Sequence, residues 1–145
     1  MSVNTFHEIG AALDGHLRSL PGIPVDGARV LIHWENTQFE KPDGKPWLQT
    51  KFMPAGSEGR SLGGNPITRA QGIYHINVFV PSGSGPKAAD HLADSIMRHF
   101  KSGIRPSHQS TTVTLRTPSR GSGITETDWY QIPVMVRWYS HTTEL

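Results

Sequence analysis

The residues most suggestive of chemistry form a glycine-rich loop between an expected strand and an expected helix. Residues 83–88 read G-S-G-P-K-A and match G-x-G-x-x-A, which cradles a pyrophosphate in dinucleotide-binding proteins. Three observations oppose that use: Pro86 has no amide hydrogen for a phosphate, the preceding strand is amphipathic, and no acidic residue follows at the distance a ribose requires. We favour a helix start, with Gly85 as its cap and Pro86 as its first residue.

Histidines and carboxylates form no compact catalytic or metal-binding pattern. His91 and Asp94 are three apart on the expected second helix, but no H-E-x-x-H is present. Asp90 and Asp94 are four apart and most simply face water, and no G-x-S-x-G nucleophile elbow occurs. The chain has no cysteine, which excludes disulfides and thiolate ligands. We therefore expect no catalysis, no cofactor and no metal.

The final expected strand points instead to association. One of its faces is apolar and consists of Tyr130, Ile132, Val134, Val136 and Trp138. Its other face carries Trp129, Gln131, Pro133, Met135, Arg137 and Tyr139. If helices cover only the first face, the second is an association surface; the alternative is a loop of the same subunit, such as residues 55–66, folded over it. Pro133 lacks an amide hydrogen, which predicts an edge strand or a bulge there.

Hydrophobic periodicity predicts the elements that position these residues. A first helix is expected from about Asn4 to Ser19, with an apolar stripe of Phe6, Ile9, Leu13 and Leu17. A second helix follows the glycine-rich loop, with Ala89, Leu92, Ala93, Ile96 and Phe100 at helical spacing. Strands are expected at residues 28–34, 47–53, 73–80, 111–117 and 124–139.

The resulting order, α-β-β-β-α-β-β, indicates an α+β domain. We expect a mainly antiparallel sheet of about five strands with two helices packed on one face. Residues 55–66 contain four glycines and almost no apolar side chain, so we expect a long loop that is functional or disordered.

Composition supports one domain over residues 1–145 and limits the classes of partner that we expect it to bind. Hydrophobic residues make up 35% and charged residues 18%, and the 15 glycines and 11 prolines suggest long ordered loops or loops that order on contact with a partner. The net charge of +2, without a run of three basic residues, does not indicate nucleic-acid binding. No run approaches the roughly 18 apolar residues of a membrane span, and the N-terminus does not read as a secretory signal.

Residues 72–100 read GIYHINVFVPSGSGPKAADHLADSIMRHF and are preceded by Leu62-Gly63-Gly64 and Arg69. This run resembles a family of small bacteriophage and prophage proteins similar to the tail terminators of long-tailed phages, and it is the most specific part of the resemblance. Weaker matches are Trp34-Glu35-Asn36, Pro46-Trp47-Leu48 and Asp128-Trp129-Tyr130, so the resemblance covers most of the chain from about Val30 to Val136.

The resemblance implies a structural virion protein at the head-proximal end of the tail, assembled in the cytoplasm of the bacterial host. Such subunits form a hexameric ring that caps the tail tube, ends its polymerisation and provides the surface that joins the head. The implied partners are further copies of the chain, the major tail tube protein and a head-completion or connector protein. Neither a membrane nor a specific nucleic acid is expected as a partner.

The family motif assigns no contact residues, so ours come from the residues themselves: Arg60, Leu62, Arg69, Trp129, Met135, Arg137 and Tyr139. Two other hypotheses stay open. The first is another head–tail connector, completion or minor tail protein of the same fold. The second, more distant, is a nucleotide-binding enzyme that uses the Gly83–Lys87 loop.

Overall fold

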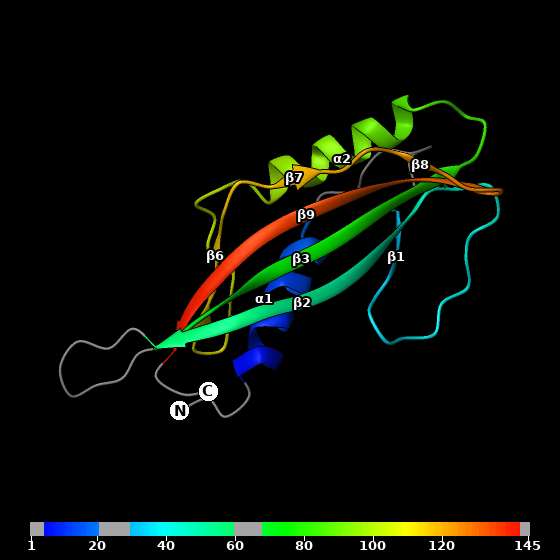
Figure 1. The fold of residues 1–145 in the computed structure, drawn as a ribbon. Helices are drawn as coiled ribbons and strands as arrows, with labels where there is room; N and C mark the ends of the chain where they lie inside the picture. The colour runs from blue at the N-terminus through cyan, green and yellow to red at the C-terminus, as the bar shows by residue number, and fades with distance from the viewer. Residues whose placement is uncertain (1–4, 21–29, 60–67, 143–145) are drawn as a thin grey trace.

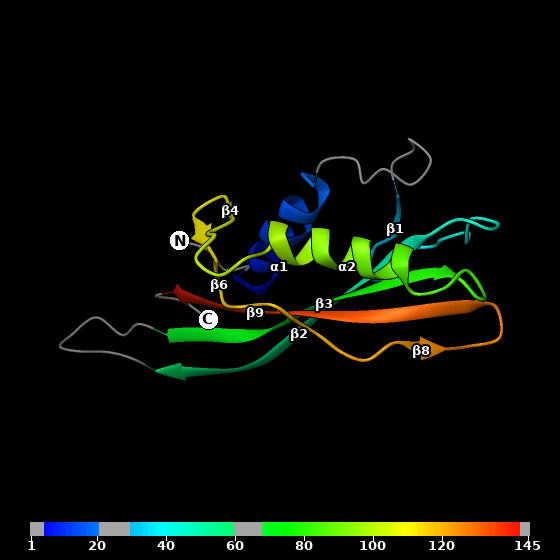
Figure 2. The same cartoon turned by 90° about the horizontal axis from the view of Figure 1, so that it is seen from above.

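The protein consists of two helices on one face of a long, twisted sheet (Figures 1 and 2). The computed structural model describes residues 5–20, 30–59 and 68–142. The helices are α1 (Thr5–Arg18) and α2 (Lys87–His99). The long strands are β2 (Trp47–Gly59), β3 (Thr68–Pro81) and β9 (Trp129–Thr142). The arrangement confirms the expected α+β class and the placement of both helices on one face.

Short strands complete the sheet, which therefore has more strands than the expected five. Strand β1 (Leu31–His33) lies beside β2, while β6 (Thr114–Leu115), β7 (Ser119–Arg120) and β8 (Ile124–Thr125) all pair with β9. A separate two-stranded ribbon consists of β4 (Ser107–His108) and β5 (Thr111–Thr112). The order across the main sheet is β1-β2-β3-β9-β6, and every pairing is antiparallel except that of β1 with β2.

The core fills the space between the helices and the sheet. Alternate residues of β3 and β9 point towards the helices and are fully buried, as the period-two pattern predicted: Tyr74, Ile76, Val78, Val80, Ile132, Val134, Val136 and Trp138. The predicted apolar residues of α2 are also fully buried: Ala89, Leu92, Ala93, Ile96 and, just after the helix, Phe100. On β2, Leu48 is buried and Phe52 stacks on Trp138 with ring centroids 5.3 Å apart.

The last two predicted strands are each broken, which corrects the expected order. The segment 111–117 forms β5 and β6, and Val113 between them donates its amide to the carbonyl of Pro106. The segment 124–139 reverses direction: Glu126 donates its amide to the carbonyl of Trp129, and β8 pairs back onto β9. The polar run T-E-T-D at residues 125–128 favours a turn over an uninterrupted strand.

Pro133 does not mark a sheet edge or a bulge, contrary to the sequence prediction. Strand β9 lies between β3 and the short strands, and Pro133 pairs with Asn77 in unbroken register. The carbonyl of Pro133 accepts a hydrogen bond from the amide of Gly121, so its ring nitrogen also faces that side. The residues opposite Pro133 lie between β7 and β8, so no strand there loses a hydrogen bond because proline has no amide hydrogen.

Three smaller predictions about element ends also need correction. Phe6 is 37% exposed, because the buried stripe of α1 runs from Thr5 through Ile9 and Leu13 and turns Phe6 to the rim. Helix α2 has Pro86 as its N-cap, one residue later than expected. Residues 55–59 belong to β2 and not to a loop, since β2 and β3 stay paired past a bulge between Pro54 and Gly56. The rest of the predicted loop, like Asn4, lies outside the described residues.

Candidate assembly surface

The sheet face that carries no helix, called the open face here, is the candidate assembly surface. Register places alternate residues of the three long strands on it. They include Gln49, Lys51 and Met53 of β2, Gln71, Ile73, His75 and Asn77 of β3, and Gln131, Pro133, Met135, Arg137 and Tyr139 of β9. These residues are half-buried or exposed, in contrast to the fully buried residues that alternate with them. Figure 2 shows both helices on the opposite side of the strands.

One end of the open face is closed by an aromatic cluster from its own subunit. Trp47 is buried and stacks on Phe79 with ring centroids 4.1 Å apart, while Trp129 meets it edge-on at 5.8 Å. Phe39, from the loop between β1 and β2, lies 5.3 Å from Trp47 and stacks on His33 at 4.9 Å. Trp129 is therefore half-buried, and loop 34–46 covers this end. Of the predicted covering loop 55–66, residues 60–66 lie outside the described residues.

The other end carries clustered arginines around Tyr139 and is called the basic end here. The guanidinium carbon of Arg69 lies 4.3 Å from the Tyr139 ring centroid, and that of Arg116 lies 5.0 Å from it. Strand pairing brings the two arginines together from β3 and from the end of β6, and Arg116 also donates its amide to the carbonyl of Arg137. Arg137 itself is exposed. Cation–π contacts of this kind fix the guanidinium planes and leave N–H groups at their edges for partners.

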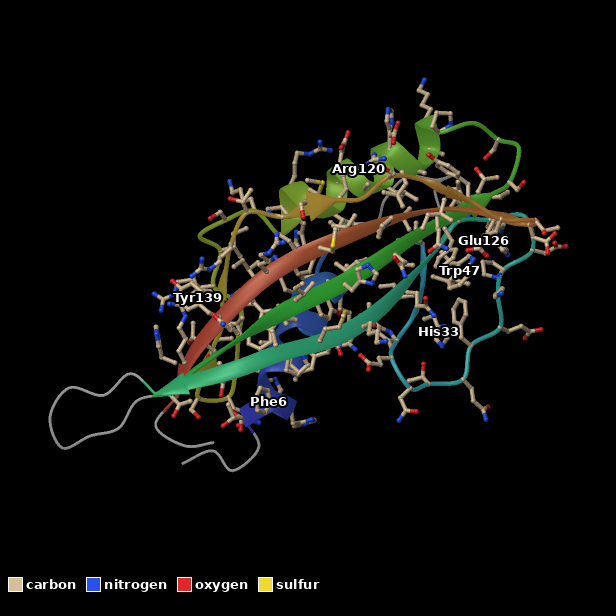
Figure 3. The ribbon with its side chains drawn as sticks, viewed as in Figure 1. Phe6, His33, Trp47, Arg120, Glu126 and Tyr139 are labelled. Carbon is tan, nitrogen blue, oxygen red and sulfur yellow. The ribbon has the colours of Figure 1, made fainter. Side chains whose placement is uncertain are left out.

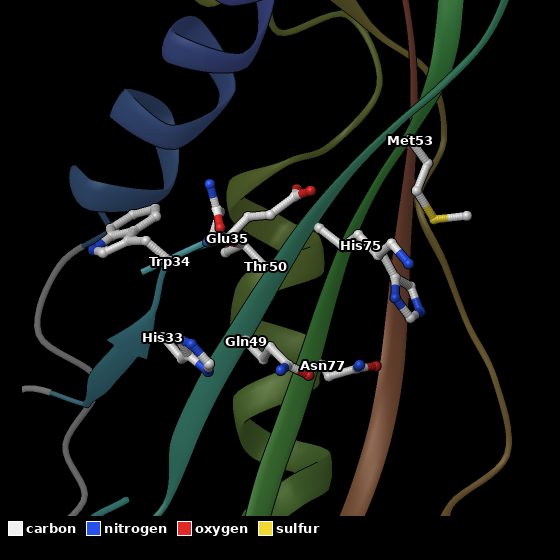
Figure 4. Close-up of a pocket in the computed structure, with 10 residues that line it drawn as sticks. His33, Trp34, Glu35, Gln49, Thr50, Met53, His75 and Asn77 are labelled. Atoms are coloured by element: carbon white, nitrogen blue, oxygen red, sulfur yellow. The ribbon is translucent and has the colours of Figure 1, made fainter. Parts of the chain in front are cut away.

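A pocket of about 490 Å³ opens at the β1–β2 edge (Figure 4). Its lining includes His33, Glu35, Gln49, His75 and Asn77. The side-chain oxygen of Asn77 is buried and has no hydrogen-bond partner in the described structure. Burial lowers the pKa of His75, and the neighbouring Lys51 ammonium lowers it further, so this ring is neutral near pH 7. The pocket therefore combines uncharged hydrogen-bonding groups with the charged side chains of Glu35 and Lys51.

Glu35 blocks the exposed edge of β2 beyond the short strand β1. Its carboxylate accepts a hydrogen bond of 2.5 Å from the amide of Phe52, and its own amide donates to the hydroxyl of Thr50 at 3.2 Å. Pro54, two residues further along, has no amide to offer. A charged side chain and a proline are established means of preventing edge-to-edge pairing, so the open face and its ends, and not this edge of β2, are the candidate surface for association.

The seven contact residues expected from sequence have different positions. Arg69, Trp129, Met135, Arg137 and Tyr139 lie on the open face, and Arg69 contacts Tyr139 directly. Trp129 lies at the opposite end, so the structure does not bring all five together. Arg60 and Leu62 lie outside the described residues. Sequence reasoning did not identify Arg116 or the Trp47–Phe79 stack. The alternation of residues in this strand did indicate that Trp47 and Leu48 face opposite sides of the sheet.

The glycine-rich turn before α2 is an exposed chain reversal. Gly83 and Gly85 have φ angles of 87° and 82°, and the hydroxyl of Ser84 donates to the carbonyl of Pro81 at 2.7 Å. Glycine is the residue that adopts such angles without strain, which accounts for the G-x-G spacing. Across the described ranges, no group of three histidine, cysteine or acidic residues is placed to hold a metal ion. Neither described helix has the length and apolarity needed to cross a membrane.

Comparison with known families matches residues 8–138 to a family described as phage tail terminator protein. The chain belongs to the phage tail terminator family. The match begins within α1 and ends within β9, so it includes α2, β2 and β3 in full and most of α1 and β9. It confirms the resemblance drawn from the Gly72–Phe100 motif, and it identifies a structural protein of the phage tail. Interaction with other tail or head proteins, and a place in the virion tail, follow from membership.

Likeness to solved structures adds evidence for the fold alone. No curated protein matches this chain. Seven chains of solved structures do match. One of them, which carries no functional name, is 24% identical, with a TM-score of 0.74 and coverage of 98% of this chain and 96% of its own. That likeness shows a shared fold over the whole domain.

Proposed function

We propose that this protein is the tail terminator of its phage: a ring of subunits that caps the tail tube, stops its polymerisation and presents the surface to which the head joins. The observation that carries the proposal is the family match over residues 8–138. A sheet with one face free of helices, and with different side chains at its two ends, supports it, because a ring subunit needs two different contact patches.

The proposed chemistry is assembly, without catalysis or a resident cofactor. Half-buried polar and apolar residues on the open face resemble the mixed composition of non-obligate protein interfaces. Such a surface stays soluble in the free subunit and becomes buried when the subunit docks on the tube or on a neighbouring copy.

Deletion of the gene tests the proposal in the phage. We expect tails of uncontrolled length that fail to join heads, seen by electron microscopy of lysates, with rescue by the gene supplied in trans. Tails of normal length joined to heads would contradict the proposal. Tails of normal length without heads would assign the protein to head joining alone.

Native mass spectrometry tests the ring directly. We expect the 16.0 kDa chain to form a closed assembly of about six copies, alone or on isolated tail tubes. A chain that stays monomeric under both conditions would contradict ring formation.

A further inference from the structure

The open face ends in opposite charges. At the basic end, Arg69 and Arg116 lie over the Tyr139 ring, and the ring of His141 contacts Tyr139 edge-on. Arg137 is exposed two residues before Tyr139, on the same face of β9. Figure 3 shows Tyr139 and Glu126 at opposite ends of the sheet. They are separated by most of β9, which has 14 residues and a length of about 40 Å at the usual rise of a strand. The two charged ends are therefore too far apart to neutralise each other within one subunit.

The arginines of the basic end lack carboxylate partners in the described structure. An ion pair forms away from this end, between Arg120 of β7 and Asp90 of α2, with 2.6 Å between the guanidinium nitrogen and the carboxylate oxygen. The Nε atom of Arg69 is buried without a hydrogen-bond acceptor among the described residues. A buried, unpaired guanidinium nitrogen is costly, and the remaining N–H groups of this guanidinium are the ones that an acceptor from another chain would bind.

The opposite end presents carboxylates. Glu126 and Asp128 lie exposed in the turn between β8 and β9, and the carbonyl of Asp128 fixes this turn by accepting the amide of Ser82 at 3.0 Å. Glu40 and Asp43 lie in the neighbouring loop 34–46, together with Lys41 and Lys45. The ammonium of Lys41 lies over the Trp47 ring at 5.7 Å. The β8–β9 turn therefore carries acidic side chains and, unlike loop 34–46, contains no lysine.

We infer that the basic end of one copy binds the β8–β9 turn of the next copy, with arginine guanidiniums on the carboxylates of Glu126 and Asp128. The inference rests on the proposed ring and specifies its contact. Because the two patches differ and lie at opposite ends of one face, the contact is heterologous and continues from copy to copy until the ring closes. Guanidiniums held over the Tyr139 ring are preorganised for binding a carboxylate.

Charge reversal at each end, alone and in a mixture, tests the contact. Arg137→Glu and Asp128→Lys each place like charges at both sides of every contact, and we expect each to weaken self-association about tenfold or more. In an equal mixture, the reversed basic end of the Arg137→Glu variant meets the reversed turn of the Asp128→Lys variant, so opposite charges face each other again. The other contact joins the unchanged basic end of Asp128→Lys to the unchanged turn of Arg137→Glu. We therefore expect the mixture to recover rings of alternating subunits, detected by native mass spectrometry.

Matched variants on the helix side serve as controls. Arg98→Glu and Asp94→Lys reverse the same charges on α2, away from the open face, and we expect rings to form normally. Rings formed by Arg137→Glu or Asp128→Lys alone would overturn the contact while leaving the ring proposal intact. Single variants that stay apart when mixed would also overturn it, because the two ends would then serve another partner such as the tail tube. A wild-type chain that never self-associates would overturn both proposals.

Discussion

At the scale of single residues, Gly72 lies where the backbone of β2 and a buried ring approach β3 closely. It lies in β3 opposite the β2 bulge, and an added Cβ would lie 2.8 Å from both the Pro54 Cα and the Trp138 ring. We expect Gly72→Ala to lower the free energy of unfolding by about 2 kcal/mol or more, because backbone and a buried ring must shift. Chemical denaturation followed by tryptophan fluorescence measures this change.

A second glycine gives the matched control. Gly15 is exposed in α1 and has no atom within 4 Å of an added Cβ, so Gly15→Ala should raise the free energy of unfolding by about 0.5–1 kcal/mol. Equal effects of the two substitutions would contradict the role given to Gly72. The sequence alone did not separate these glycines, because the constraint on Gly72 comes from Trp138, which is distant in the chain.

At the scale of elements, two histidines clasp the ends of the helices. The rings of His16 and His99 stack with centroids 4.0 Å apart, and each Nε2–H donates to the other residue's carbonyl at 2.6 Å. Burial lowers the pKa of His16, the carbonyl of His99 opposes that shift, and the neighbouring ring adds to it. The unfolded chain therefore binds protons more readily at this site, so stability is full above pH 6.5 and falls as the pH decreases below that value.

Thermal unfolding between pH 8 and pH 5.5 tests this clasp. We expect the midpoint of the wild-type protein to fall with decreasing pH, and His16→Gln to reduce the size of that fall. Some pH dependence should remain, because the pKa of His75 is lowered too. His7→Gln, an exposed position on the same helix, is the control. An unchanged pH dependence in His16→Gln would show that the clasp does not contribute.

Local periodicity predicted the elements well where one period persisted, and poorly where pairing partners decided the outcome. The strand Ile73–Val80 and the apolar face of α2 follow directly from their spacing. The breaks after Thr112 and after Thr125 do not, because β5 and β8 end where the partners β4 and β9 end. The parallel pairing of β1 likewise depends on how the intervening loop returns.

At the scale of the whole molecule, the core and the face proposed for assembly lie on opposite sides of the sheet. Helices and buried alternate residues form the core on one side, and the open face carries half-buried and exposed side chains. The sequence indicated this division, because the last strand alternates between an apolar and a mixed face. It did not indicate the basic end, since Arg69, Arg116 and Tyr139 come from three strands that only the tertiary register brings together.

Alanine substitutions at the two ends of β9 separate assembly from folding. Trp129 packs edge-on to the buried Trp47, so Trp129→Ala should lower the free energy of unfolding by about 2–3 kcal/mol. Tyr139→Ala removes the surface on which two guanidiniums lie, which should cost the monomer only about 1 kcal/mol but should strongly weaken the ring. Tyr139→Phe keeps the aromatic face and should form rings normally. Native mass spectrometry and denaturation of the same samples distinguish the two effects. Intact rings from Tyr139→Ala, or an unfolded domain, would show that Tyr139 does not act through assembly.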